Sequence, residues 1–262
     1  MEKAIFISNT KNLELITREY TRLYFGIEFC ERLIPSTEEL SYILNFTIAN
    51  NMDFTFVTPF VTDNGLKKLE PLIEYLVNFE KQVEIVINDW GFLSLLKKRK
   101  WNGPLVLGRL LTKQKRGPRI MNVLHKLPKA AVEHFRQSNI DVPILSDFLI
   151  ENGIYRVELD NLLQGISRPN SLLKGSLYFP YAYVTVTRYC LIASSVSKTT
   201  IFRSISPCNK ECQNHEFELS HASMPVKLLL KGNTQFFRND NLPNDLESLN
   251  IDRLVFEPKL PI

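Results

Sequence analysis

Short apolar runs alternate along this chain with longer segments that carry helical spacing. The runs predict strands and cover residues 3–9, 23–30, 53–61, 83–89, 104–112 and 154–162. The clearest helical segment is 36–51, which Ser36 is placed to cap and which sets Leu40, Ile43, Leu44 and Ile48 on one face. We also expect a helix within 12–33, ahead of the second strand. Strands of this length alternating with helices indicate βαβ units and a mainly parallel sheet.

Roughly six such units fall within the first 190 residues, so we predict an α/β domain that is barrel-like and related to the TIM barrel. Spacing alone leaves an open sheet as the alternative. The apolar segment 177–195 predicts a buried pair of strands, and 225–240 and 251–261 predict additional C-terminal strands. We expect a single domain over residues 1–262.

Composition narrows the class of protein without identifying it. Hydrophobic residues make up 44% and charged residues 23% of the chain, as in ordinary globular proteins, and the net charge of +4 does not favour a dedicated nucleic-acid binder. The first residues lack a signal-peptide core, and no apolar run of about 18 residues is present to span a membrane. We therefore expect a cytoplasmic protein, in which cysteines are free thiols or metal ligands rather than disulfides.

The four cysteines are Cys30, Cys190, Cys208 and Cys212. Cys208 and Cys212 form a close pair in a polar segment, a common way to supply two thiolates to one centre. Cys30 and Cys190 fall at the ends of predicted strands and would complete fourfold thiolate ligation, although either one alone also fits a small buried hydrophobe. Four thiolates suit tetrahedral zinc or an iron–sulfur cluster, and two ligands from distant strands favour the cluster.

Polar residues at predicted strand ends form a candidate pocket: Asn88, Asp89, Arg109, Thr112 and, further on, Arg238. Arg109 has the chemistry to hold a carboxylate or phosphate through two parallel hydrogen bonds. The alternative is that Asp89 and Arg109 pair with each other and tie two strands together. Arg238 either reaches this pocket or belongs to a plain strand.

Two basic stretches, 97–100 and 112–119, concentrate positive charge. A solvated helix end explains the first. The second would suit phosphate contacts to RNA, with Lys113, Lys115 and Arg116 as the contacting residues, but it lacks the interleaved aromatic residues that stack bases.

Several motifs together resemble the peptidase U32 family, and within it the UbiV-like branch of the UbiU/UbiV pair. They are LYFGIEFCER (23–32), VINDWGFLSLL (86–96), LVLGRLLTKQKRGPR (105–119), and TRYC (187–190) followed by CNKEC (208–212). The order of the cysteines, one early, one late and then a close pair, is similar to that of the family. The resemblance covers nearly the whole chain.

The resemblance implies a barrel-like fold and a 4Fe-4S cluster held by Cys30, Cys190, Cys208 and Cys212. It also implies oxygen-independent hydroxylation of a small-molecule ubiquinone precursor, in a heterodimer with a related U32 chain, with RNA base modification as an alternative. From the residues alone, a non-enzymatic metal-stabilised binding protein is the other alternative.

Peptidase activity is disfavoured, because no Gly-x-Ser-x-Gly or His-Glu-x-x-His motif is present. The four histidines, which we expect to be exposed, are His125, His134, His215 and His221. The sequence assigns no catalytic residue.

Overall fold

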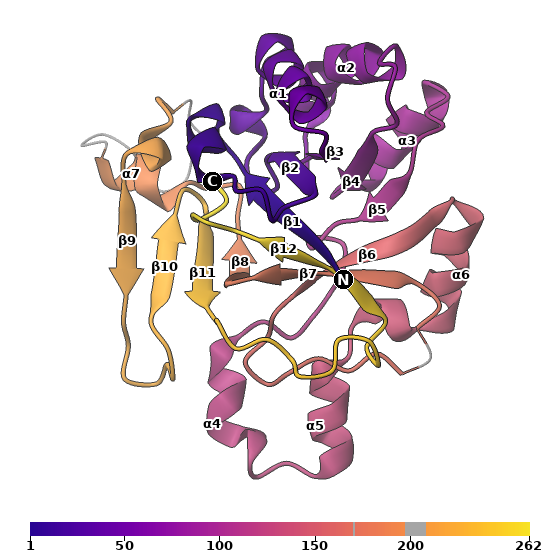
Figure 1. Ribbon diagram of the computed structural model, residues 1–262. Helices are drawn as coiled ribbons and strands as arrows, with labels where there is room; N and C mark the ends of the chain where they lie inside the picture. Colours follow the sequence, from indigo (N-terminus) through magenta and orange to yellow (C-terminus); the bar gives the residue numbers. More distant parts are fainter. Residues whose placement is uncertain (170, 197–207) are drawn as a thin grey trace.

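Eight parallel strands close into a barrel in the computed structural model, which describes residues 1–169, 171–196 and 208–262 (Figure 1). Around the barrel, β1 to β7 follow the chain and the last strand, β12, lies between β7 and β1. The bounds are β1 Glu2–Ile7, β2 Arg22–Gly26, β3 Asp53–Val57, β4 Glu84–Ile87, β5 Leu105–Leu107, β6 Ile154–Asp160, β7 Lys174–Phe179 and β12 Ile251–Phe256. The predicted α/β, TIM-barrel-like fold class is confirmed.

Helices follow most of the barrel strands, and α1, α2, α3 and α6 pack outside it along the top and right of Figure 1. The α-helices are α1 Thr37–Ala49, α2 Asp63–Val77, α3 Trp90–Lys98, α4 Met121–Leu124, α5 Lys129–Arg136, α6 Pro143–Glu151 and α7 Leu191–Val196. The 3-10 turns are η1 Thr10–Leu15, η2 Glu31–Leu33, η3 Pro118–Ile120, η4 Asn139–Asp141 and η5 Glu211–Gln213. Among the described residues, no helix has both the length and the apolar character that crossing a membrane requires.

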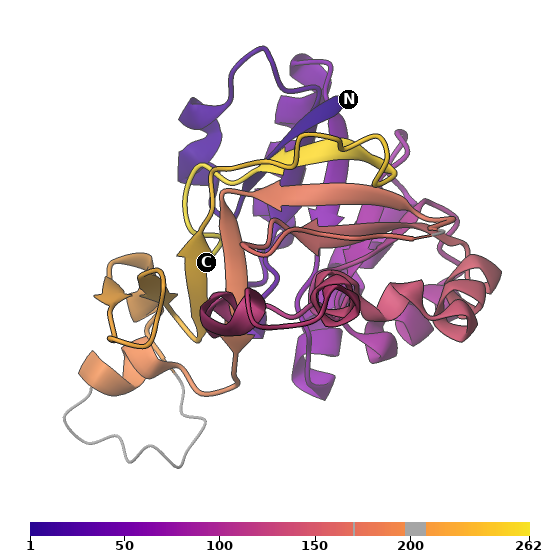
Figure 2. The same ribbon diagram turned by 90° about the horizontal axis from the view of Figure 1, so that it is seen from below.

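A second, antiparallel sheet lies between β7 and β12 in sequence and to one side of the barrel in space (Figures 1 and 2). Its strand order is β8–β11–β10–β9. The bounds are β8 Tyr181–Val186, β9 Glu216–Leu219, β10 Leu228–Lys231 and β11 Thr234–Arg238. Only Pro180 separates β7 from β8, so the chain leaves the barrel and enters the small sheet without a loop.

The barrel is filled by alternate side chains of its strands, as the period of two of a β-strand requires. The inward-facing apolar set is Ala4, Phe6, Tyr24, Val57, Val86, Val106, Tyr178 and Val255. The opposite faces of the strands pack against the helices in the largest apolar cluster. Glu158 and Arg253 are also buried, so the barrel interior is partly polar.

Several expected elements differ from those observed. The segment 12–33 forms η1 and β2 rather than an α-helix, and Ile48 is 45% exposed although its helical spacing suggested a buried face. The two strands within 177–195 belong to different sheets and do not pair with each other. The segment 251–261 is not accessory, because its strand β12 closes the barrel.

Candidate functional site

A buried cluster of charges lies at the C-terminal end of the barrel, where functional side chains of α/β barrels gather. Glu28 follows β2, Arg109 follows β5, Asp160 ends β6, and Glu257 follows β12. All four side chains are fully buried. Because the strands are parallel, their ends bring together residues that lie far apart in the sequence.

Arg109 uses all five of its N–H donors within the protein. Its Nε donates to Glu28 at 3.0 Å, and its Nη1 donates to Asp160 at 3.1 Å and to the Tyr181 carbonyl at 3.3 Å. Its Nη2 donates to Glu28 and, at 2.7 Å, to Glu257. The guanidinium also stacks on the Tyr178 ring, 3.8 Å from its centroid. A guanidinium has no further donor, so Arg109 would hold a ligand carboxylate only by releasing one of its own.

The pKa values follow from this packing. Burial favours the neutral guanidinium, but the carboxylates of Glu257, Glu28 and Asp160 outweigh it and raise the pKa of Arg109 well above its usual value. Burial also raises the pKa of the Glu257 carboxyl well above its ordinary value, with further raising by Glu28 and Asp160 against the opposing Arg109. Burial therefore favours the neutral form of the Glu257 carboxyl.

Arg116 adds a second guanidinium to the three carboxyl groups of the cluster. Its Nε donates to Asp160 at 2.6 Å, and its Nη2 donates to the carbonyls of Arg109 and Thr112. The guanidinium lies over the Tyr183 ring, 4.2 Å from the centroid, and is buried. Arg116 thus fixes the loop after β5, and its guanidinium is not available for the RNA contacts considered from the sequence.

Asn88 and Asp89 have positioning roles at the end of β4. Asn88 donates to the Thr58 carbonyl at 2.9 Å and accepts from the Leu110 N–H at 3.0 Å. A Cβ on Gly108 would lie 2.1 Å from the Asn88 Oδ1 atom, so this close approach requires glycine. Asp89 caps α3 by accepting from the N–H groups of Gly91 and Phe92. The suggested Asp89–Arg109 pair is therefore wrong.

The two remaining candidates for this pocket, Thr112 and Arg238, differ in their environment. Thr112 is buried, and its hydroxyl has no hydrogen-bond partner among the described residues. Arg238 ends β11, is exposed, and pairs with Asp240 at 2.8 Å. Arg238 is thus engaged at the surface of the small sheet.

The four cysteines converge beside this charge cluster. Cys30 precedes η2, Cys190 precedes α7, and Cys212 lies in η5 with Cys208 shortly before it. Neighbouring thiols contribute to the raised pKa values of Cys30, Cys190 and Cys212. Neither Cys30 nor Cys190 ends a strand as expected, because β2 ends at Gly26 and β8 at Val186. The chain beyond each strand nevertheless brings Cys190 and Cys212 into one apolar cluster with Phe29, the residue before Cys30.

Asn233 ties the first two cysteine segments to each other. Its side-chain amide donates to the Phe29 carbonyl at 2.7 Å and to the Thr187 carbonyl at 2.6 Å. Phe29 directly precedes Cys30, and it packs in one apolar cluster with Ile192, Phe236 and Cys212. One buried amide thus joins the loop after β2 to the loop after β8.

Burial dominates the chemistry of these thiols. It raises the pKa of Cys212 to about 11, and the nearby Cys190, Cys30 and Cys208 thiols act in the same direction. Burial likewise raises the pKa of Cys30 and of Cys190. Thiols whose ionisation is disfavoured in this way are stabilised as thiolates when they share a cation. No three His, Cys, Asp or Glu side chains in the described ranges are arranged to hold a metal ion.

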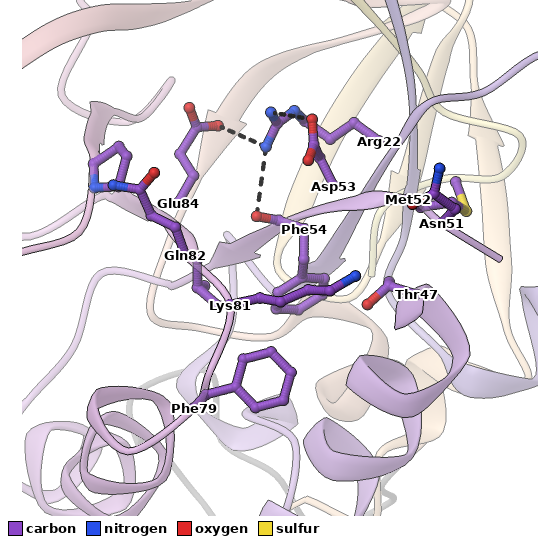
Figure 3. Close-up of a pocket in the computed structure, with 12 residues that line it drawn as sticks. Arg22, Thr47, Asn51, Met52, Asp53, Phe54, Phe79, Lys81, Gln82 and Glu84 are labelled. Atoms are coloured by element: carbon purple, nitrogen blue, oxygen red, sulfur yellow. Dashed lines mark hydrogen bonds and ion pairs between the residues drawn. The ribbon is translucent and has the colours of Figure 1, made fainter. Parts of the chain in front are cut away.

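A hollow of about 470 Å³ opens at the opposite, N-terminal end of the barrel (Figure 3). Arg22, Asp53 and Glu84 line it at the starts of β2, β3 and β4, with Lys81 and Phe79 nearby. Arg22 is already paired, since its guanidinium donates to Asp53 at 3.0 Å and to Glu2 at 2.6 Å. This end of such barrels contributes mainly to stability.

Comparison with known proteins gives structural likeness at low identity. No family model matches this sequence, and no curated protein matches it. The U32 peptidase Mk0906 is similar over 100% of this chain and 94% of its own, at 8% identity and a TM-score of 0.46.

Two glycoside-processing enzymes show comparable likeness. A family 18 N-acetylglucosaminidase from Paenibacillus barengoltzii is 9% identical, over 97% of this chain and 94% of its own, with a TM-score of 0.38. A class V chitinase from Nicotiana tobaccum is 9% identical, over 98% of this chain and 93% of its own, also at 0.38. Likenesses at this level carry no argument about activity.

Sequence reasoning missed the acids that surround Arg109. Glu28, Asp160 and Glu257 each stand at or just beyond the end of an apolar strand run. The sequence did contain a signal for them, namely an acidic residue at the end of several predicted parallel strands. Such residues meet at one end of a barrel.

Proposed function

We propose that Cys30, Cys190, Cys208 and Cys212 hold a 4Fe-4S cluster and that this chain is a U32-family protein of the UbiV-like branch. On the resemblance, it acts in oxygen-independent hydroxylation of a ubiquinone precursor, together with a related U32 chain. The observation that carries the proposal is that Cys190 and Cys212 pack in one apolar cluster with Phe29, the residue before Cys30, although these segments lie far apart in the sequence.

The donor set fits an iron–sulfur cluster. It consists of four soft thiols, and apolar side chains of Phe29, Ile192 and Phe236 pack around Cys212. One zinc ion would need all four sulfurs about 2.3 Å from a single point. In a cluster each thiolate binds its own iron, so the sulfurs stay further apart.

The chain positions these ligands through neutral contacts. Asn233 fixes the backbone next to Cys30 and near Cys190, while the Ala193 N–H donates to the Cys190 sulfur at 3.4 Å. N–H donors to ligand sulfurs are one of the means by which a protein sets a cluster's reduction potential. A bound cluster would supply one-electron chemistry at this site.

Beside Cys30 lies a small cavity of about 60 Å³, lined by Phe60, Thr62 and Arg188, which is well below the roughly 300–1,000 Å³ of small-molecule sites. The Arg109 cluster lies on the other side of Phe29, whose ring is 5.6 Å from the guanidinium carbon. The saturated hydrogen bonds of Arg109 favour a rigid support for the thiol segments over a substrate-binding role.

The test is the visible absorbance and iron content of anaerobically purified variants. We expect Cys208→Ala and Cys30→Ala to lose most of both, because each removes one of four ligands. Asn209→Ala is the matched control, since Asn209 lies between the paired cysteines and is exposed. Unchanged iron in Cys208→Ala, with iron present in the parent protein, would contradict the proposal.

A further inference from the structure

A second cavity near the C-terminal end of the barrel lies between the loop after β5 and the segment from α5 to η4. It measures about 410 Å³, and its lining includes Lys113, Lys115, His134, Phe135 and Asp141. Pockets of roughly 300–1,000 Å³ are the usual size for small-molecule sites. The loop is the basic stretch 112–119, which the cysteine site does not use.

The walls of this cavity are fixed by hydrogen bonds. Gln114 accepts from the Asp160 N–H at 2.9 Å, which ties the loop to the end of β6. On the other side, the Lys113 N–H donates to the Asn139 side chain at 2.6 Å, and the Asn139 N–H donates to the Lys113 carbonyl at 3.1 Å. The cavity is therefore anchored to the same barrel end as Glu28 and Arg109.

Positive charge faces this cavity with little compensation. Lys113, Lys115 and His134 supply up to three cations, and Lys113 spends one donor, on the Leu110 carbonyl at 2.7 Å. Asp141 lines the cavity too; its Oδ2 accepts from the Ser138 N–H and hydroxyl, and burial raises the pKa of this carboxyl, which favours its neutral form. Its Oδ1 is buried without a partner among the described residues. In contrast, Arg22 in the hollow of Figure 3 is paired with carboxylates.

The environment of Lys113 also favours an anion in this cavity. Burial and the nearby Arg116 guanidinium lower the pKa of Lys113. An anion beside Lys113 would stabilise its ammonium form. Phe135 adds an aromatic face to the lining, next to the His134 ring, 5.9 Å between centroids.

We propose that this cavity binds the anionic group, phosphate or carboxylate, of a small aromatic ligand through Lys113, Lys115 and His134, with the ligand ring against Phe135. The inference does not depend on the cluster, because none of these residues is a proposed cluster ligand.

Isothermal titration of the full chain with phenyl phosphate, phenylacetate and inorganic phosphate tests the site. We expect at least one aromatic anion to bind the parent protein, and Lys115→Gln combined with His134→Gln to weaken that binding about tenfold or more. Lys129→Gln is the control: Lys129 is exposed on the same helix, α5, and is not part of the lining.

The three probes distinguish the contribution of the anionic group from that of the aromatic ring. Stronger binding of phenyl phosphate than of phenylacetate identifies a phosphate ligand, and the reverse identifies a carboxylate; both support the site. Phe135→Leu should weaken the aromatic anions more than inorganic phosphate. The proposal is overturned if neither aromatic anion binds at millimolar concentration, or if Lys129→Gln weakens binding as much as the double variant.

Discussion

At the scale of single residues, Arg109 has the chemistry to bind a ligand anion, but in the structure it is bound to other residues of the protein. Its guanidinium is fully buried and is satisfied by Glu28, Asp160, Glu257 and a carbonyl. Removing one member of a buried ionic network leaves the others uncompensated in a medium of low polarity.

Arg109→Met should therefore lower the free energy of unfolding by about 3–5 kcal/mol. The substitution leaves Glu28 and Asp160 with fewer partners while largely preserving side-chain volume. Urea denaturation measures the change. Arg238→Met is the matched control, because Arg238 forms an exposed pair with Asp240 and such pairs contribute about 0–1 kcal/mol. Equal effects of the two substitutions would argue against the framework role.

Glu158 provides a pH-dependent test inside the barrel. Its Oε1 accepts from the Tyr24 hydroxyl at 3.2 Å, and its Oε2 has no partner among the described residues. Burial raises the pKa of Glu158 well above its usual value, with Arg253 opposing and Glu84 and Glu28 adding to the rise.

Above the unfolded pKa of about 4.3, the unfolded state has released this proton and the native state retains it. The unfolded state then binds fewer protons, so the free energy of unfolding attributable to Glu158 falls as the pH rises towards the folded pKa. Glu158→Gln removes this term, so its stability relative to the parent should improve between about pH 5 and 8. A relative stability that does not change with pH, measured by denaturation, would show that Glu158 is not held protonated.

At the scale of elements, the sequence predicts correctly those features that depend on a single segment. Ser36 caps α1 as predicted, and with Glu39 it forms a capping box. Asn9 instead caps the 3-10 turn η1, and the next element along the chain is β2, without an α-helix between them. That outcome depends on tertiary packing, which overrides weak helical spacing.

Ser36→Ala should lower the free energy of unfolding by about 1 kcal/mol, because it removes the acceptor for the Glu39 N–H at the start of α1. Thermal or urea denaturation measures the loss. Ser220→Ala, a substitution at an exposed serine outside the helices and strands, should be close to neutral. A neutral Ser36→Ala would mean that α1 is held by packing alone.

At the scale of the whole molecule, the barrel could be predicted from the alternation of strands and helices, but its closure could not. The residues 251–256 look like any late strand in sequence, and only pairing with β1 and β7 makes them the closing strand. The partners of Arg109 were hidden for the same reason, since Glu28 and Glu257 lie 81 and 148 residues away.

The small sheet explains how distant cysteines meet. It inserts between β7 and β12 and carries Asn233, which joins the segments of Cys30 and Cys190. The four cysteines and the close pair among them can be seen in the sequence. The spatial proximity of the cysteine segments depends on the inserted sheet, and no local sequence pattern predicts it.

The central claim is that these four thiols bind one inorganic cluster. The most direct measurement is the iron and acid-labile sulfide content of the anaerobically purified chain. The account predicts about four of each per chain. Stoichiometric zinc in place of iron, or iron without sulfide, would contradict it.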